Sequence, residues 1–208
     1  MNDFELQPLL IHSTAHDLAH ATGVYVVPGL HERDVARGCA IGLSATCSQC
    51  RTDFEDLRGD PGGNWGNAVK LMDKAQEDDR RCLTVEVHCN SSTEAQRFGT
   101  MMFFPWGWAP APAIEGLLKE RLVPIVPPNF WQRSVGLPDP KFPLDDQQWN
   151  WGYLRHVTER GFHLRPAILI ELGYIQSPEF CTFISDNDNQ ARVGFVIGQC
   201  LCDWLSNP

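Results

Sequence analysis

The stretch Pro166-Ala167-Ile168-Leu169-Ile170-Glu171-Leu172 decides the fold of this chain. It is a continuous apolar run with one carboxylate, Glu171, near its end. Strands that are covered on both faces read as unbroken apolar runs, and this pattern is typical of parallel sheets. The stretch therefore predicts a buried central strand. Its carboxylate stands at the carboxyl end, the edge where open α/β sheets bind their ligands.

Apolar and alternating segments elsewhere predict the rest of the sheet and its helices. Further strands are predicted at residues 9–11, 83–88 and 98–104. Helices are predicted at residues 32–47, 69–78, 113–122 and 189–205. The inward face of the first helix is predicted to carry Val35, Cys39, Ile41, Leu43 and Cys47. Strands that alternate with helices predict an α/β fold, in which a twisted, mostly parallel or mixed sheet is flanked by helices.

The segments between these elements are rich in Pro, Gly, Asp and aromatic residues, which indicates loops. Loops are predicted at residues 12–20, 51–66 and 105–112, and residues 105–151 together are predicted to form a long irregular excursion. The 208 residues contain no internal repeat and no linker-like segment. We therefore expect a single domain over residues 1–208.

The charge balance argues against several classes of partner. The chain has 17 basic and 26 acidic residues, a formal net charge of −9. An acidic chain lacks the basic surface that binds nucleic acid or an anionic membrane, so we expect neither partner. The sequence does not define the oligomeric state, for which we favour a monomer. No apolar run approaches the roughly 18–20 residues of a membrane span. The acidic start, Met1–Glu5, is unlike a secretory signal peptide, so none is expected.

Eight cysteines are spread over the chain. In the absence of a signal peptide, we expect them to be reduced thiols. Cys47 and Cys50 form a C-x-x-C pair and Cys200 and Cys202 a C-x-C pair, so a structural zinc site built from these four is the alternative. A thioredoxin-like role is less favoured, because the C-x-x-C pair closes a predicted helix rather than opening one.

Imidazole and carboxylate groups stand where α/β topology brings the chain to one edge of the sheet. The loop predicted after the first strand carries His12, His16 and His20. Glu32 begins the first long helix, His88 ends a strand and Glu171 ends the central strand. Two imidazoles and one carboxylate make a zinc site with an open fourth position, the arrangement of catalytic zinc.

Each of these residues taken singly also has a structural interpretation. Glu32 could favour the start of its helix through the helix dipole. His88 could be a hydrogen-bonded core histidine, and Glu171 could be a capping or salt-bridged group. Their joint arrangement is what favours a site.

Four motifs resemble those of the zinc-dependent N-acetylmuramoyl-L-alanine amidases. Residues 166–178, Pro-Ala-Ile-Leu-Ile-Glu-Leu-Gly-Tyr-Ile-Gln-Ser-Pro, resemble the family's Pro-Ala-Val-Leu-Val-Glu-Leu-Gly-Phe-Ile-Ser-Asn-Pro. Residues 86–90, Glu-Val-His-Cys-Asn, resemble its Ser-Ile-His-Ala-Asn. Residues 30–35 resemble its Leu-Lys-Glu-Lys-Asp-Val helix start, and residues 152–155 its Leu-x-Val-Leu-Arg element. The resemblance runs from about residue 8 to residue 205.

This resemblance implies a role for each candidate residue. His16, Glu32 and His88 would be the ligands of Zn²⁺, and Glu171 would be the general base and then the general acid. Arg155 would steady a substrate carboxylate or an oxyanion, unless it forms a structural ion pair.

The first ligand and the partners of the imidazoles are less closely defined. The family's Gly-rich loop around the first histidine is absent, and the spacing to the helix start favours His16, with His12 and His20 as alternatives. Asn90 or Asp34 could fix the tautomer of a ligand imidazole.

The resemblance implies hydrolysis of the amide bond between N-acetylmuramic acid and L-alanine in peptidoglycan. The alternatives are another zinc amidohydrolase or carboxypeptidase that acts on N-acyl amino acids or peptides, and a catalytically inactive cell-wall binding module. The expected absence of a signal peptide implies synthesis in the cytoplasm and action on the wall after release, as for a phage endolysin or a delivered toxin.

Overall fold

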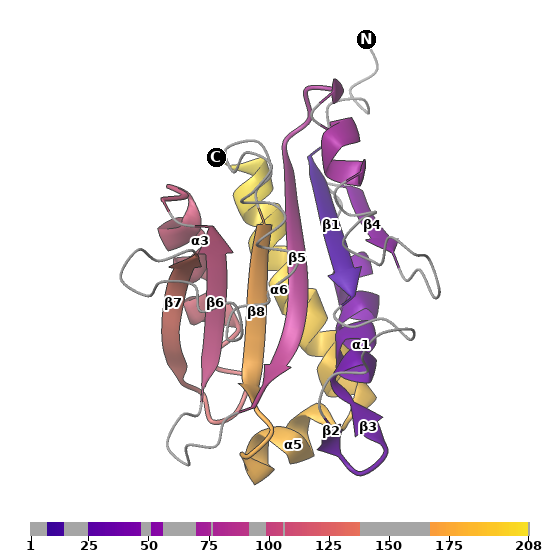
Figure 1. The fold of residues 1–208 in the computed structure, drawn as a ribbon, viewed down its shortest axis with the longest axis vertical. Helices are drawn as coiled ribbons and strands as arrows, with labels where there is room; N and C mark the ends of the chain where they lie inside the picture. The colour runs from indigo at the N-terminus through magenta and orange to yellow at the C-terminus, as the bar shows by residue number, and fades with distance from the viewer. Residues whose placement is uncertain are drawn as a thin grey trace.

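A six-stranded sheet forms the centre of the computed structural model, which describes residues 8–14, 25–46, 51–55, 70–75, 77–91, 99–105, 107–137 and 167–207 (Figure 1). The strand order is β4-β1-β5-β8-β6-β7. The strands are β1 (Leu9–Thr14), β4 (Arg51–Glu55), β5 (Cys82–Asn90), β6 (Thr100–Pro105), β7 (Trp131–Leu137) and β8 (Ala167–Tyr174). A separate antiparallel pair, β2 (Tyr25–Val27) and β3 (Leu30–His31), precedes the first helix.

Strand β8 is the buried central strand that the apolar run at residues 166–172 predicts. All eight of its residues are buried, because it lies between β5 and β6 with both faces covered. Strands β4, β1, β5 and β8 run parallel to one another, whereas β6 is antiparallel to β8 and parallel to β7. The arrows in Figure 1 show this reversal. The predicted α/β fold with a mostly parallel sheet flanked by helices is therefore confirmed.

Helices cover both faces of the sheet. The helices are α1 (Glu32–Ser44), α3 (Ala111–Arg121), α5 (Pro178–Ile184) and α6 (Asn187–Ser206). All four place buried side chains in one apolar cluster with alternate residues of the strands. Residues 70–75 are also helical, and Met72 and Ala75 pack into a second cluster with the other alternate residues, including Leu9, Ile11 and Leu169. Apolar side chains therefore pack against both faces of the sheet, and the face that a strand residue takes decides which of the two clusters it joins.

Helices α1 and α6 pack closely because glycine stands where they cross. A methyl group added at Gly194 of α6 would lie 1.8 Å from the carbonyl oxygen of Cys39, and one at Gly42 would lie 1.8 Å from that of Ala191. Only glycine permits this backbone approach. The two helices form a tight layer behind the sheet in the view of Figure 1.

Two predicted loops contain edge strands. Residues 51–55 form β4 at one edge, and residues 131–137, inside the predicted excursion at 105–151, form β7 at the other. Both segments mix charged or polar residues with apolar ones, as edge strands commonly do, so neither shows the apolar run of a buried strand. In addition, α3 begins at Ala111, inside the loop predicted at 105–112.

The first helix and the first strand also differ in detail from the prediction. Ile41 is 70% exposed rather than inward, and Ala36 and Ala40 are buried on the inner face of α1 beside Val35 and Cys39. Strand β1 continues through His12 to Thr14, so His12 lies in the sheet and not in a loop.

The cysteines are not all reduced thiols. Cys202 is disulfide-bonded, and its partner lies outside the described residues. The free thiols are Cys39, Cys82, Cys89, Cys181 and Cys200. Since Cys200 is free and Cys202 is in a disulfide, the alternative of a zinc site that uses both is wrong. None of the helices in the described part of the chain is long and apolar enough to cross a membrane.

Candidate functional site

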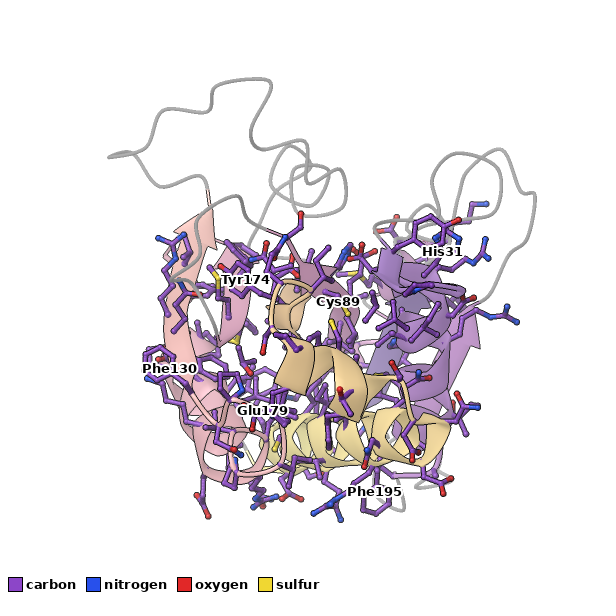
Figure 2. The ribbon with its side chains drawn as sticks, turned by 90° about the horizontal axis from the view of Figure 1, so that it is seen from below. His31, Cys89, Phe130, Tyr174, Glu179 and Phe195 are labelled. Atoms are coloured by element: carbon purple, nitrogen blue, oxygen red, sulfur yellow. The ribbon has the colours of Figure 1, made fainter. Side chains whose placement is uncertain are left out.

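The candidate site lies at the carboxyl edge of the parallel strands. The chain passes from β1 through α1 to β4 on one side, and then returns to β5 on the other side of β1. Such a reversal in strand order is where open α/β sheets bind ligands. Figure 2 views this edge end-on, with His31, Cys89 and Tyr174 along it and α6 below them.

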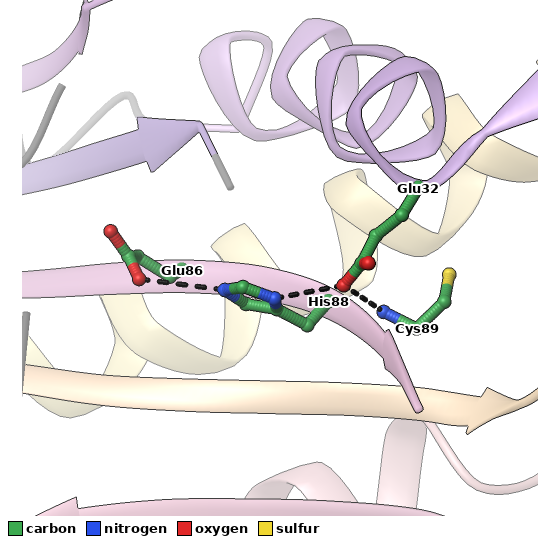
Figure 3. A network of polar contacts seen from close by, with 4 residues as sticks. All are labelled: Glu32, Glu86, His88 and Cys89. Atoms are coloured by element: carbon green, nitrogen blue, oxygen red, sulfur yellow. Dashed lines mark hydrogen bonds and ion pairs between the residues drawn. The ribbon is translucent and has the colours of Figure 1, made fainter. Parts of the chain in front are cut away.

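Glu32 and His88 meet at this edge. Glu32 is the first residue of α1 and His88 lies near the end of β5, yet Glu32 Oε1 is 2.8 Å from His88 Nδ1 (Figure 3). The backbone N–H of Cys89 donates to the same oxygen at 3.0 Å. Asp34 accepts a hydrogen bond from the backbone N–H of His31, which fixes the start of the helix that carries Glu32. A backbone donor and a helix start therefore hold this carboxylate against the imidazole.

Glu86 lies on the other side of the same imidazole. It stands two residues before His88, so the two side chains share one face of β5. Glu86 Oε2 is 3.5 Å from His88 Nε2 (Figure 3). Burial alone would lower the pKa of His88, but Glu32, Glu86 and Glu171 together raise that pKa well above its usual value. The site thus concentrates negative charge around one partly buried imidazole.

Glu171 completes the group from the neighbouring strand. It is opposite His88 in the parallel register of β5 and β8, and its side chain is on the same sheet face as His88. Glu171 is 5% exposed, and its Oε2 has no hydrogen-bond partner among the residues that the structure describes. Burial raises the pKa of Glu171 to about 8, with His88 lowering it and Glu32 raising it. A carboxyl group with such a pKa can exchange a proton near neutral pH.

His12 does not join this group. On β1 it shares a face with Leu10, and it is opposite Val85 in the register with β5. Leu10 and Val85 both belong to the apolar cluster under α1 and α6. The side chain of His12 is therefore on the opposite face of the sheet from His88, and burial lowers its pKa to about 3. This is a core histidine, and the structure gives no support to His12 as the alternative ligand.

The structure thus brings together three of the residues that the sequence singles out, Glu32, His88 and Glu171. His16, His20 and Arg155 lie outside the described residues. In the part of the chain that the structure describes, the two residues expected to fix an imidazole tautomer contact groups other than His88, and the expectation stays open for His16, which lies outside the described residues. Asn90 donates to Met101 Sδ at 3.6 Å, and Asp34 holds the helix start.

Glu86 takes the place beside the imidazole, and the sequence reading missed it. The signal was available, because residues two apart on a strand share a face and a carboxylate in a buried strand is unusual.

The donor groups fit zinc as far as the structure describes them. No three His, Cys, Asp or Glu side chains in the described ranges are grouped so as to hold a metal ion. Glu32 and His88 supply one carboxylate and one imidazole that converge, and both are ligand types that zinc takes. The buried Glu171 oxygen beside them lacks a described partner, as expected of a group that acts on a ligand.

Comparison with solved structures identifies the fold. Against the catalytic domain of CwlV, an N-acetylmuramoyl-L-alanine amidase from Paenibacillus polymyxa, the TM-score is 0.68 at 16% identity, over 97% of this chain and 99% of that one. The amidase AmiC2 of Nostoc punctiforme gives 0.66 at 15% identity, over 98% of each chain. The amidase Ami1 of Mycobacterium smegmatis gives 0.68 at 10% identity, over 98% of this chain and 99% of that one.

At the level of sequence, no family model and no curated protein matches the chain. The structural likeness extends over nearly the whole length of each chain, so it concerns the complete arrangement of sheet and helices. The chain therefore has the α/β fold of N-acetylmuramoyl-L-alanine amidases, as its sequence motifs imply.

Proposed function

We propose that this protein hydrolyses the amide bond between N-acetylmuramic acid and L-alanine in peptidoglycan, with zinc as its cofactor. One observation carries the proposal: Glu32, His88 and Glu171 lie together at the carboxyl edge of a sheet that has the amidase fold. Three separate segments of the chain supply these residues, and each of them carries a motif that resembles the amidases.

Glu32 and His88 would hold the zinc ion through Oε1 and Nδ1, the atoms that face one another. His16, which follows the end of β1 by two residues, would be the third ligand. When bound, zinc would supply Lewis acidity toward the scissile carbonyl and would lower the pKa of a water molecule. The backbone N–H of Cys89 keeps the Glu32 carboxylate in place for this role.

Glu171 would move the proton. Its Oε2 accepts a proton from the attacking water and later delivers it to the amine of L-alanine, which leaves with the stem peptide. A carboxyl group suits both steps when its pKa lies near the working pH, and burial supplies that condition here. The nearby imidazole of His88 pulls the pKa back down and so favours the basic form.

Arg155 and the site of action complete the proposal. Arg155 would steady a carboxylate of the stem peptide or the oxyanion that forms during hydrolysis. The protein would be made in the cytoplasm and act on the wall after release, as a phage endolysin or a delivered toxin does.

Mass spectrometry of digested peptidoglycan tests the activity. Purified peptidoglycan is incubated with the zinc-loaded protein, with a chelator-treated sample and with the zinc-loaded Glu171→Gln variant. Free stem peptides that begin with L-alanine, released by the zinc-loaded parent protein alone, are the expected result. Intact muropeptides in every sample would reject this substrate. Cleavage of small N-acyl amino acids or peptides would then favour another amidohydrolase, and wall binding without cleavage would favour an inactive binding module.

A further inference from the structure

Glu86 is a buried carboxylate that the proposed reaction does not use. It is 6% exposed on a strand whose other residues up to Val87 are also buried. A carboxylate in such surroundings costs free energy unless it is paired or hydrogen-bonded. The amidase motif that residues 86–90 resemble has Ser at this position. The chain therefore carries an extra buried acid at the centre of its candidate site.

The geometry connects this acid to the imidazole ring of His88. Glu86 Oε2 is 3.5 Å from Nε2, whereas Nδ1 faces Glu32 at 2.8 Å. The ring thus lies between two carboxylates, one at each nitrogen (Figure 3). A neutral imidazole carries its proton on one ring nitrogen and a lone pair on the other. A group that accepts the proton of Nε2–H therefore leaves the lone pair on Nδ1.

We propose that Glu86 is a positioning residue, which accepts a hydrogen bond from Nε2–H of His88 and so keeps the lone pair of Nδ1 directed toward the space beside Glu32. Carboxylates that hold a ligand histidine in this way fix its tautomer and its ring orientation. The inference rests on the proposed function, because Glu86 can position a metal ligand only if His88 binds the metal. Glu86 itself touches neither substrate nor metal in this arrangement.

Zinc affinity of three variants tests the inference, measured by competition with a chromophoric chelator. Glu86→Ala removes the acceptor and is expected to weaken zinc binding about 10–100-fold. Glu86→Gln keeps an oxygen that can accept from Nε2–H, so it should stay within a few-fold of the parent protein. Thr84→Val is the matched control, since Thr84 is buried on the same face of the same strand, and it should leave the affinity unchanged. Thermal unfolding of each zinc-free variant checks that it folds.

Nitrogen-15 spectra of the histidine rings in the zinc-loaded proteins give a second readout. The parent protein and Glu86→Gln should show a proton bound to Nε2 of His88 that exchanges slowly with water. Glu86→Ala should lose this signal or show fast exchange. A purely structural role for Glu86 would change stability without this pattern.

Three outcomes would overturn the inference. The first is a Glu86→Ala protein that keeps both the zinc affinity and the Nε2 proton signal. The second is an equal loss in Glu86→Ala and Glu86→Gln, because Glu86 would then act through its charge. The third is a comparable loss in Thr84→Val, which would assign the effect to repacking of the strand. Failure of the proposed metal site is distinguishable, because Glu32→Ala and His88→Ala would then bind zinc as well as the parent protein.

Discussion

Two histidines on neighbouring parallel strands of this sheet, His12 buried and His88 partly buried, have opposite chemistry. His12 on β1 is fully buried under the layer of α1 and α6, and burial lowers its pKa to about 3. His88 on β5 lies among Glu32, Glu86 and Glu171, which raise its pKa well above the usual value despite burial. The first imidazole is held neutral, whereas the second is surrounded by groups that favour positive charge.

Strand register explains the difference. His12 is opposite Val85, and His88 stands three residues further along β5, so the two side chains are on opposite faces of the sheet. One face continues as the apolar cluster under the helices, and the other ends in carboxylates at the carboxyl edge. A histidine in a buried strand is therefore a site candidate only when its face carries polar partners.

Replacing each histidine in turn should give the largest contrast. His88→Ala removes a proposed zinc ligand, so we expect loss of stoichiometric zinc and a fall in peptidoglycan hydrolysis of at least about 10³-fold. His12→Leu changes a side chain on the opposite face and should keep both zinc and activity. Metal analysis of the purified proteins and assays of stem-peptide release check both expectations. Zinc loss in His12→Leu with His88→Ala unaffected would reverse the assignment.

Glu171→Gln should separate turnover from metal binding on the face that carries His88. Gln has the same shape but cannot take up the proton, so we expect turnover to fall about 10²–10⁴-fold. Zinc content should stay the same, because Glu171 is not a proposed ligand. Rates of stem-peptide release at saturating substrate, together with metal analysis, provide the measurement. Near-parental turnover would show that another group moves the proton.

The sequence predicts the face of His88 better than that of His12. Apolar runs locate β1, β5 and β8. A polar residue at the end of such a run locates His88 and Glu171, and the start of the first long helix locates Glu32, near one edge. The apolar run Leu9-Leu10-Ile11 predicts that His12 begins a loop, although the strand continues to Thr14.

The edges of the sheet and the contacts of side chains were harder to predict. Strands β4 and β7 were missed because an edge strand needs no apolar run. Glu86 lies two residues before His88 on the same face of β5, so the sequence shows that the two are neighbours, but only the side-chain packing shows that its Oε2 reaches Nε2 of His88. Local patterns thus predict buried elements, whereas partners across the sheet depend on tertiary packing.

Replacing Gly194 by alanine should disturb the packing of α1 against α6 over His12 and leave the candidate site unchanged. The added methyl of Gly194→Ala would lie 1.8 Å from the carbonyl oxygen of Cys39, so α1 and α6 must move apart. We expect a loss of about 1–3 kcal/mol in the free energy of unfolding, measured by urea titration. Gly116→Ala is the matched control. Gly116 is exposed on α3, and no neighbouring group lies within 4 Å of the methyl that would be added there. That variant should gain about 0.5–1 kcal/mol.

The pH dependence of stability tests the neutral state of His12. The pKa of His12 is about 3 in the folded protein and 6.5 in the unfolded chain, so between these values only the unfolded chain takes up the proton. The contribution of His12 is fully present above pH 6.5 and falls as the pH drops toward 3. At about 1.4 kcal/mol per pH unit, this residue should cost about 2 kcal/mol between pH 7 and pH 5.

His12→Leu removes the titratable imidazole. It therefore provides the comparison for the loss in the free energy of unfolding between pH 7 and pH 5. Other groups also titrate in this range, and Glu171, with its raised pKa, acts in the opposite direction because it favours the folded state as the pH falls toward 4.5. The quantity to measure is therefore the change in unfolding free energy from pH 7 to pH 5, compared between parent and variant. The parent should lose about 2 kcal/mol more than His12→Leu. Equal losses would mean that His12 titrates alike in both states, and the contrast between the two faces would then rest on His88 alone.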